Sequence, residues 1–187
     1  MPRRIVMLEE KELELLGMCP QVGQRLNTKP FLIPPARCAS RSLQPKDLLA
    51  GMVFVSTLPN ISKHACAAQI LGLEEEVRHR VPEARLVHIS ADAPKFWNEV
   101  DLIHPDLKAE GYSLFGADEE SRMAFTQTFG VGVLGSPRIA HGLFSLQDGV
   151  VLAAEIPLQQ MGVPSIGRFM HRALSSAASA SACACPH

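Results

Sequence analysis

The sequence lacks the features that mark three large classes of proteins. Its 187 residues include 18 basic and 19 acidic side chains, a formal net charge of −1, and no basic stripe or run of like charge indicates binding to nucleic acid or to an anionic membrane surface. No apolar stretch is long enough to span a bilayer. Residues 5–8 follow a basic start but are too few for the core of a signal peptide. We therefore expect an intracellular, cytoplasmic protein.

The sequence also lacks a Cys-x-x-Cys pair and the dense cysteine spacing of a disulfide framework. Its five cysteines are an odd number, and in a reducing compartment they are free thiols, so that any disulfide among them is transient. The missing Cys-x-x-Cys argues against a thioredoxin-type disulfide exchanger. No internal repeat or interdomain linker is evident, and the length suits one domain. We expect that domain over residues 1–174, followed by a disordered low-complexity tail of Ser and Ala over residues 175–187.

One stretch organises the rest of the chain. Residues 52–55 form a short apolar run typical of a buried strand, a polar loop follows, and Cys66 then precedes apolar residues at helical spacing that end before Pro82. This order places the Cys66 sulfur in or near the first turn of a helix, where free backbone N–H groups and the helix dipole favour a thiolate. The alternative is that Cys66 is a small buried hydrophobe.

The remaining pattern predicts an α/β fold. A second buried strand over residues 85–90 would complete a right-handed βαβ unit. Two β-rich runs separated by Asp148 and Gly149 predict a hairpin. Residues 3–17 suit either a β-hairpin or a short helix. The other predicted elements are a helical turn within residues 42–49, a helix over 92–100 with Asp92 or Ala93 near its cap, a strand over 113–115, a helix over 119–129 ended by Gly130, strands over 138–146 and 150–156, and a helix over 165–174.

Several motifs, in the same order along the chain, resemble one known family. Pro59-x-x-x-Lys63-x-x-Cys66 resembles the Pro-x-x-x-Thr-x-x-Cys pattern of peroxiredoxins, and Cys66-Ala67-Ala68-Gln69 is similar to their thiol peroxidase branch. The resemblance extends over residues 13–172. Its further motifs are Ser90-Ala91-Asp92-Ala93-Pro94, Phe129-Gly130-Val131, which resembles Tyr-Gly-Val, and Ser136-Pro137, which falls where the branch has Gly-Pro.

This resemblance implies a fold and a reaction. The fold is thioredoxin-like, of the peroxiredoxin type, with a central mixed β-sheet flanked by helices and an N-terminal β-hairpin. The Cys66 thiolate would attack hydrogen peroxide or an organic hydroperoxide and become a sulfenic acid, which a thioredoxin-type or small-thiol reductant would reduce. No cofactor or metal is expected. The family also implies a homodimer, which the sequence itself neither supports nor refutes.

The site departs from the family at two positions, while Pro59 and Cys66 match. Lys63 replaces the threonine that orients the peroxide; it would favour a thiolate, or it is an ordinary solvated lysine. Ser62 would replace the lost hydroxyl or cap the helix. His141 occupies the position of the arginine; it would act if protonated, or it is a half-buried strand histidine. Arg138, three residues earlier on the same predicted strand, should point to the opposite face and could replace the arginine only if a bulge shifts the register.

The resolving cysteine of the branch is also missing, because its position holds Asp101. A partner for Cys66 would come from Cys183 or Cys185 in the flexible tail, from Cys38 or Cys19, or from an external thiol. We expect Cys19 and Cys38 to be structural. Cys183-x-Cys185-x-His187 only weakly resembles a metal cluster, and a metallochaperone would need a second thiol in the loop before Cys66, where the sequence has none.

Two hypotheses follow. The first is a thiol-dependent peroxidase with Cys66 as nucleophile, its activity weakened by Lys63 and His141. The second is a catalytically degenerate peroxiredoxin fold that serves as a redox sensor or protein-binding module.

Overall fold

The computed structural model describes residues 3–183 as a mixed α/β fold with two sheets. The larger sheet has six strands in the order β3-β6-β5-β4-β8-β9, and the smaller has three in the order β1-β2-β7. Within residues 3–183, no helix combines the length and apolar character needed to cross a membrane. The strands of the larger sheet are β3 (Pro35–Arg37), β4 (Met52–Leu58), β5 (Arg85–Ser90), β6 (Glu110–Ser113), β8 (Gly142–Gln147) and β9 (Val150–Glu155).

Strand β4 is the centre of the larger sheet because its apolar and β-branched residues are buried on both faces. It pairs in parallel with β5 and antiparallel with β8. The parallel pair is joined by helix α1 (His64–Arg80), which confirms the predicted βαβ unit. β8 and β9 form the predicted antiparallel hairpin, whose turn residues Asp148 and Gly149 both have positive φ.

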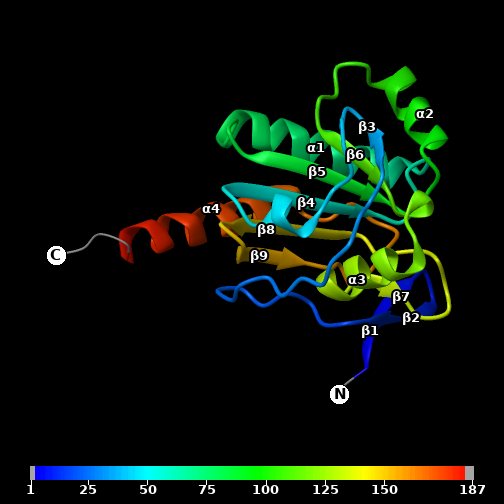
Figure 1. Ribbon diagram of the computed structural model, residues 1–187, viewed down its shortest axis with the longest axis horizontal. Helices are drawn as coiled ribbons and strands as arrows, with labels where there is room; N and C mark the ends of the chain where they lie inside the picture. The colour runs from blue at the N-terminus through cyan, green and yellow to red at the C-terminus, as the bar shows by residue number, and fades with distance from the viewer. Residues whose placement is uncertain (1–2, 184–187) are drawn as a thin grey trace.

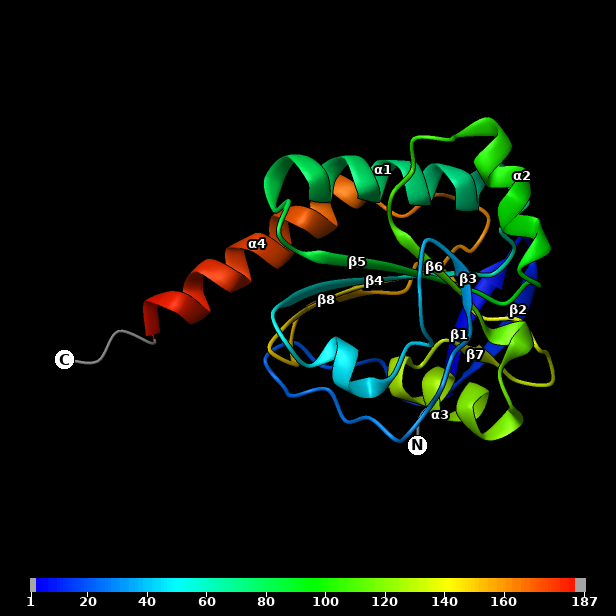
Figure 2. The same cartoon turned by 45° about the horizontal axis from the view of Figure 1, so that its top comes forward.

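Helices cover both faces of this sheet (Figures 1 and 2). On one face α1 packs beside α4 (Ile166–Cys183), and Phe54 of β4 contacts Phe169 of α4 edge to face. On the other face α3 (Glu119–Phe129) contributes Phe125 and Phe129 to the main core, which also includes Val53 and Val55 of β4. The alternation of side chains along β4 thus supplies both cores.

The smaller sheet is built on the N-terminal hairpin. β1 (Arg4–Leu8) pairs antiparallel with β2 (Lys11–Leu16), and β2 pairs with the short β7 (Gly132–Val133). The structure therefore selects the hairpin over the short helix that the sequence equally allowed. The backbone of Met7 also bonds to Leu158 and Gln160, which attaches the segment after β9 to the hairpin.

Several predicted boundaries were correct. β5 has the predicted bounds, and α3 begins at an Asp118 cap and ends at Gly130 in the left-handed conformation. A 3-10 helix, η1 (Pro45–Leu48), forms the helical turn predicted within residues 42–49.

Three predicted elements were displaced. Helix α2 (Lys95–Ile103) begins after Pro94 rather than at Asp92, because the Asp92 side chain is used by other segments. The strand predicted at 113–115 is β6, which ends at Ser113 before the 3-10 helix η2 (Leu114–Gly116). The strand predicted from residue 138 begins only at Gly142, and residues 138–141 form a loop apart from a single bridge at Ile139.

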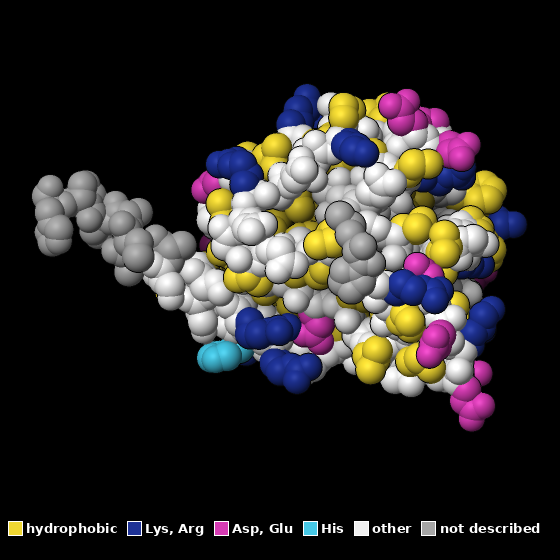
Figure 3. Space-filling model, turned by 90° about the horizontal axis from the view of Figure 1, so that it is seen from below, with side chains coloured by type: hydrophobic (Ala, Val, Ile, Leu, Met, Phe, Trp, Pro, Cys, Tyr) yellow, Lys and Arg dark blue, Asp and Glu magenta, His cyan; other side chains and the backbone are white. Residues whose placement is uncertain are grey.

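The last helix is longer than the sequence indicated. The predicted helix ended at Leu174, with a disordered tail from residue 175, but α4 continues through the Ser- and Ala-rich segment to Cys183 and projects from the body of the molecule (Figure 1). Alanine is the strongest helix former, which explains the extension of a helix already anchored by Phe169 and Met170. On the face seen in Figure 3, Lys and Arg side chains are interspersed with Asp and Glu, in keeping with the balanced composition.

Candidate active site

Cys66 lies in the first turn of α1, as the sequence predicted. Lys63 is the N-cap, and the backbone N–H of Cys66 donates to the Lys63 carbonyl oxygen at 3.0 Å. The Cys66 side chain is only 1% exposed and packs among Leu58, Ile61 and Ile70. Cys66 nevertheless lines a large cavity. The residue is therefore buried, as one sequence alternative expected, and also faces a space that a substrate could occupy, as the other required.

His141 faces this thiol. The loop before β8 carries the imidazole into the core, where its Nε2 lies 3.8 Å from the Cys66 sulfur. Its Nδ1 lies 2.8 Å from Oε1 of Gln69, and its backbone N–H donates to Oε1 of Gln160 at 2.6 Å. His141, predicted from the sequence as a site residue on a strand, therefore lies beside Cys66 but precedes β8 instead of lying on it.

Arg138 also reaches the site, against the prediction that it would point away. Because residues 138–141 form a loop, the alternation of side chains along a strand does not apply to them. Arg138 Nη1 donates to the carbonyl oxygen of Pro59 at 2.9 Å and forms an ion pair with Asp92. Asp92 in turn accepts a hydrogen bond from the backbone N–H of Ile61 at 2.8 Å. The pair fastens the loop before Cys66 to the end of β5.

The loop from Pro59 to Lys63 forms one rim of the cavity, but its side chains differ in their involvement. Pro59, Asn60 and Lys63 line the cavity, and Lys63 is exposed. Ser62 is exposed and does not line it; its hydroxyl donates to Oδ1 of Asn60 at 2.7 Å. Lys63, not Ser62, holds the N-cap position, and no side chain there caps α1. His64 is exposed at the start of α1.

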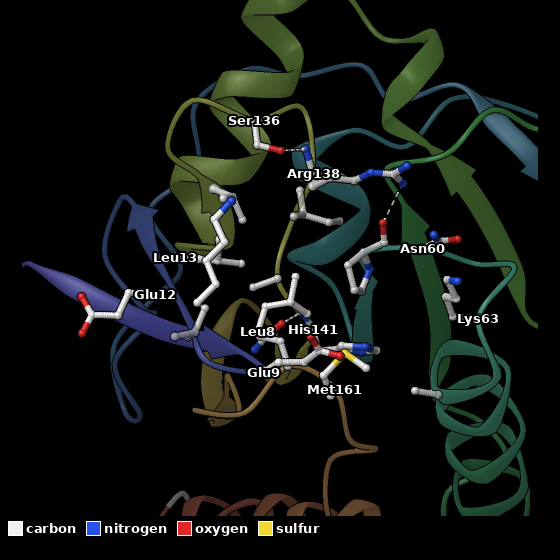
Figure 4. Close-up of a pocket in the computed structure, with 18 of the residues that line it drawn as sticks. Leu8, Glu9, Glu12, Leu13, Asn60, Lys63, Ser136, Arg138, His141 and Met161 are labelled. Atoms are coloured by element: carbon white, nitrogen blue, oxygen red, sulfur yellow. Dashed lines mark hydrogen bonds between the residues drawn. The ribbon is translucent and has the colours of Figure 1, made fainter.

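The cavity has a volume of about 1130 Å³ and is formed by four separate parts of the chain. In the close-up of Figure 4, Leu8, Glu9, Glu12 and Leu13 of the N-terminal hairpin lie opposite Asn60 and Lys63. Ser136, Arg138 and His141 come from the segment that leads into β8, and Met161 comes from the segment that follows β9 (Figure 4). The hairpin contributes both charged side chains, Arg3, Glu9, Lys11, Glu12 and Glu14, and apolar ones. The larger apolar side chains that line the cavity are Val6, Leu8, Leu13, Val133, Leu134, Ile139, Met161 and Val163.

Burial changes the ionisation of both central groups. It raises the pKa of the Cys66 thiol to about 12, although the Asn60 backbone N–H and the Arg138 charge act in the opposite direction; the Asp92 carboxylate raises it further. Burial also lowers the pKa of His141 to about 4. Burial therefore favours the neutral thiol, in the opposite direction to the sequence expectation that the start of the helix would favour a Cys66 thiolate. It also favours a neutral imidazole at His141.

Cys19 and Cys38 lie apart from this cavity. Cys19 is half-buried and packs against the main core, and burial raises its pKa. Cys38 is exposed in the loop after β3. Neither lines the cavity with Cys66, and both are free thiols. Cys185 lies outside the described residues, as does the side chain of Cys183, so their proposed resolving role stays a prediction.

Two residues of the site were not identified from the sequence as members of it. Gln69 was noticed only as part of a motif, and its position three residues after Cys66 places both side chains on the same side of α1, which was a usable signal. Gln160 lies in an irregular segment, and no local pattern indicates its contact with His141.

Comparison with known proteins shows which solved structures share this fold. No protein-family model matches the sequence, and no curated protein sequence matches it significantly. Solved structures do match: a thiol peroxidase from Chromobacterium violaceum is 16% identical with a TM-score of 0.73, over 95% of this chain and 99% of that one. A peroxiredoxin-like protein from Aquifex aeolicus is 15% identical with a TM-score of 0.72, over 92% and 97%. The peroxidoxin BcpB from Mycobacterium tuberculosis is 16% identical with a TM-score of 0.63, over 83% and 97%.

These likenesses confirm the predicted fold. The chain has a thioredoxin-like fold of the peroxiredoxin type, with the mixed sheet, flanking helices and N-terminal hairpin that the motifs implied.

Proposed function

We propose that this protein is a divergent peroxiredoxin that reduces peroxides through a sulfenic acid on Cys66. The observation that carries the proposal is the position of Cys66, whose sulfur lies in the first turn of α1, at the wall of a large cavity and 3.8 Å from the Nε2 atom of His141. A thiol so placed has a substrate-sized space before it and a proton acceptor beside it. The peroxidase names of the structural neighbours agree with this assignment.

The cavity favours organic hydroperoxides over hydrogen peroxide as substrates. Its volume of about 1130 Å³ far exceeds what hydrogen peroxide needs, and apolar side chains such as Leu13, Leu134 and Val163 line it. The sulfenic acid would then be reduced by a thioredoxin-type or small-thiol reductant. A resolving thiol within the chain, a homodimer and a cytoplasmic location remain predictions from the sequence.

Trapping of the sulfenic acid tests this proposal. The reduced protein is treated with one equivalent of cumene hydroperoxide or hydrogen peroxide in the presence of a dimedone-type trap, and the adduct is mapped by mass spectrometry. We expect rapid labelling at Cys66, its loss in Cys66→Ser, and no change in Cys38→Ser, which removes an exposed thiol outside the cavity. Labelling of Cys38 at a rate equal to or above that of Cys66 would contradict the assignment.

A second candidate function is a degenerate peroxiredoxin fold that acts as a redox sensor or binding module. The raised pKa of Cys66, together with an exposed lysine at the position of the peroxide-orienting threonine, favours it. Loss of one stabilising donor typically slows such chemistry by about 10²–10³-fold. Peroxide turnover with excess reductant separates the two candidates, since a degenerate protein would consume peroxide no faster than its Cys66→Ser variant.

A further inference from the structure

Gln69 has a fixed orientation in the core of the site. It is fully buried on α1, and its amide nitrogen donates to Oγ of Ser56 at 2.7 Å. The same nitrogen lies 3.3 Å from the carbonyl oxygen of Thr57 and 3.5 Å from that of Gly142. Carbonyl oxygens only accept hydrogen bonds, so the nitrogen must face these two strands. The Gln69 oxygen is thereby directed at Nδ1 of His141.

This orientation determines which nitrogen of His141 carries the proton. The Gln69 oxygen is an acceptor, so Nδ1, 2.8 Å away, must be the N–H donor. In a neutral imidazole the other nitrogen then has a free lone pair. That nitrogen, Nε2, is the atom 3.8 Å from the Cys66 sulfur, within reach of the thiol proton. The opposite tautomer would direct the Nε2–H at the sulfur, and the imidazole would then offer no lone pair to accept the thiol proton.

We propose that Gln69, His141 and Cys66 form a proton relay, in which Gln69 fixes the His141 tautomer and His141 is the general base for Cys66. The inference rests on the peroxidase function proposed above. The Cys66 S–H proton moves to His141 Nε2 as the sulfur attacks the terminal oxygen of ROOH. The S–O bond forms, the O–O bond breaks, and the departing RO⁻ takes the proton from Nε2. The products are the Cys66 sulfenic acid and ROH, with sulfur oxidised and the peroxide reduced.

The relay suits the charges around the thiol. Arg138 is the cation whose charge lowers the pKa of Cys66, and it is already paired with Asp92 and bonded to the Pro59 carbonyl oxygen. Lys63 also lines the cavity but is exposed to solvent. The field of Arg138 is therefore largely neutralised, and the site has little means of holding a lasting thiolate. Proton transfer that accompanies attack avoids a separate buried anion. Gln69 acts only through His141, so it is a positioning residue.

The tautomer can be observed directly. Long-range ¹H–¹⁵N NMR spectra of uniformly ¹⁵N-labelled protein at neutral pH should show His141 protonated at Nδ1 and unprotonated at Nε2. Gln69→Met removes the acceptor and should shift His141 toward the Nε2–H form, whereas Gln69→Glu retains an acceptor and should keep the Nδ1–H form. Gln160→Met is the matched control, because Gln160 bonds His141 only at its backbone N–H and otherwise donates to the Pro157 carbonyl oxygen, so the tautomer should be unchanged. An Nε2–H form in the unmodified protein overturns the relay, whatever the reaction with peroxide.

Kinetics supply a second test. The rate of sulfenic acid formation at Cys66 should be lower in D₂O than in H₂O, because the thiol proton moves during attack. Gln69→Met should reduce this rate by about 10²–10⁴-fold, the usual contribution of a general base, and abolish the isotope effect, while Gln69→Glu restores both. Fast reaction with no isotope effect would refute the relay and leave the peroxidase assignment intact. Slow reaction at Cys66, no faster than at Cys38, would instead refute the peroxidase assignment, while the NMR spectra still decide the relay geometry.

Discussion

Mild acid should destabilise the protein, because His88 is held neutral in the core. His88 lies on β5 and is fully buried beside the Trp97 ring, with 6.5 Å between the ring centroids. Among the described residues, neither of its ring nitrogens has a hydrogen-bond partner. Burial, assisted by the positive charge of Arg37, lowers the pKa of His88 from 6.5 to about 3.

The sign and size of the effect follow from proton linkage. The unfolded chain protonates His88 near pH 6.5 and the folded chain only near pH 3, so unfolding takes up a proton between these values. Well above pH 6.5, His88 is neutral in both states and does not change the free energy of unfolding. As the pH falls below 6.5, the free energy of unfolding decreases by about 1.4 kcal/mol per pH unit. At pH 5 the loss is about 2 kcal/mol. His141, whose pKa burial lowers to about 4, adds a loss of similar size at pH 5.

Urea denaturation at a series of pH values measures this loss. The free energy of unfolding of the wild type should decrease by about 3 kcal/mol between pH 6.5 and pH 5, and His88→Leu should remove about half of that dependence. His171→Gln, which replaces an exposed histidine on α4, is the control and should leave the dependence unchanged. Carboxylates with lowered pKa values, such as Asp47 and Asp148, protonate below this range. An equal pH dependence in wild type and His88→Leu would refute the reasoning.

Two further predictions use other contacts of the structure. Gly130→Ala should lower the melting temperature, because φ is +63° there and the added Cβ would lie 2.6 Å from backbone atoms of Met18. Calorimetry should show a loss of about 1–3 kcal/mol in the free energy of unfolding. Gly167→Ala is the control and should not destabilise the protein, because the space around Gly167 in α4 is open. The second concerns the ion pair near the thiol: Asp92→Asn should lower the pKa of Cys66 and Arg138→Met should raise it. Iodoacetamide alkylation rates against pH measure both, and shifts in the same direction would contradict the charge assignment.

The parts of the fold that were predictable depend on local sequence. The Cys66 loop and helix follow from residues within about twenty positions of one another, and Asp118 and Gly130 mark the two ends of α3 by local capping. The turn at Asp148 and Gly149 is equally local. The family motifs added the N-terminal hairpin, which the sequence pattern alone had left open.

The unpredicted parts depend on contacts between distant segments. Arg138 enters the site because residues 138–141 form a loop, in which the Thr57 hydroxyl donates to the Ala140 carbonyl oxygen at 2.9 Å. The composition of these residues is typical of a strand and indicates neither the loop nor this hydrogen bond. β6 includes Gly111, a residue that disfavours strands, and the Trp97 ring lies where a Cβ at this position would be, a contact that the sequence does not reveal. The high pKa of Cys66 reflects enclosure by the whole cavity, whereas the sequence revealed only the start of α1.

The enclosure of Cys66 has a consequence for how the chain matures. The thiol and His141 are 75 residues apart, and the cavity is completed only by the segment around Met161. A growing or unfolded chain therefore presents Cys66 as an ordinary thiol with a pKa of about 8.5, partly ionised and open to any electrophile in its surroundings. Completion of the fold withdraws the sulfur from indiscriminate alkylation and oxidation and leaves it accessible through one cavity. Under the proposed function, folding both creates the reactive site and protects its nucleophile.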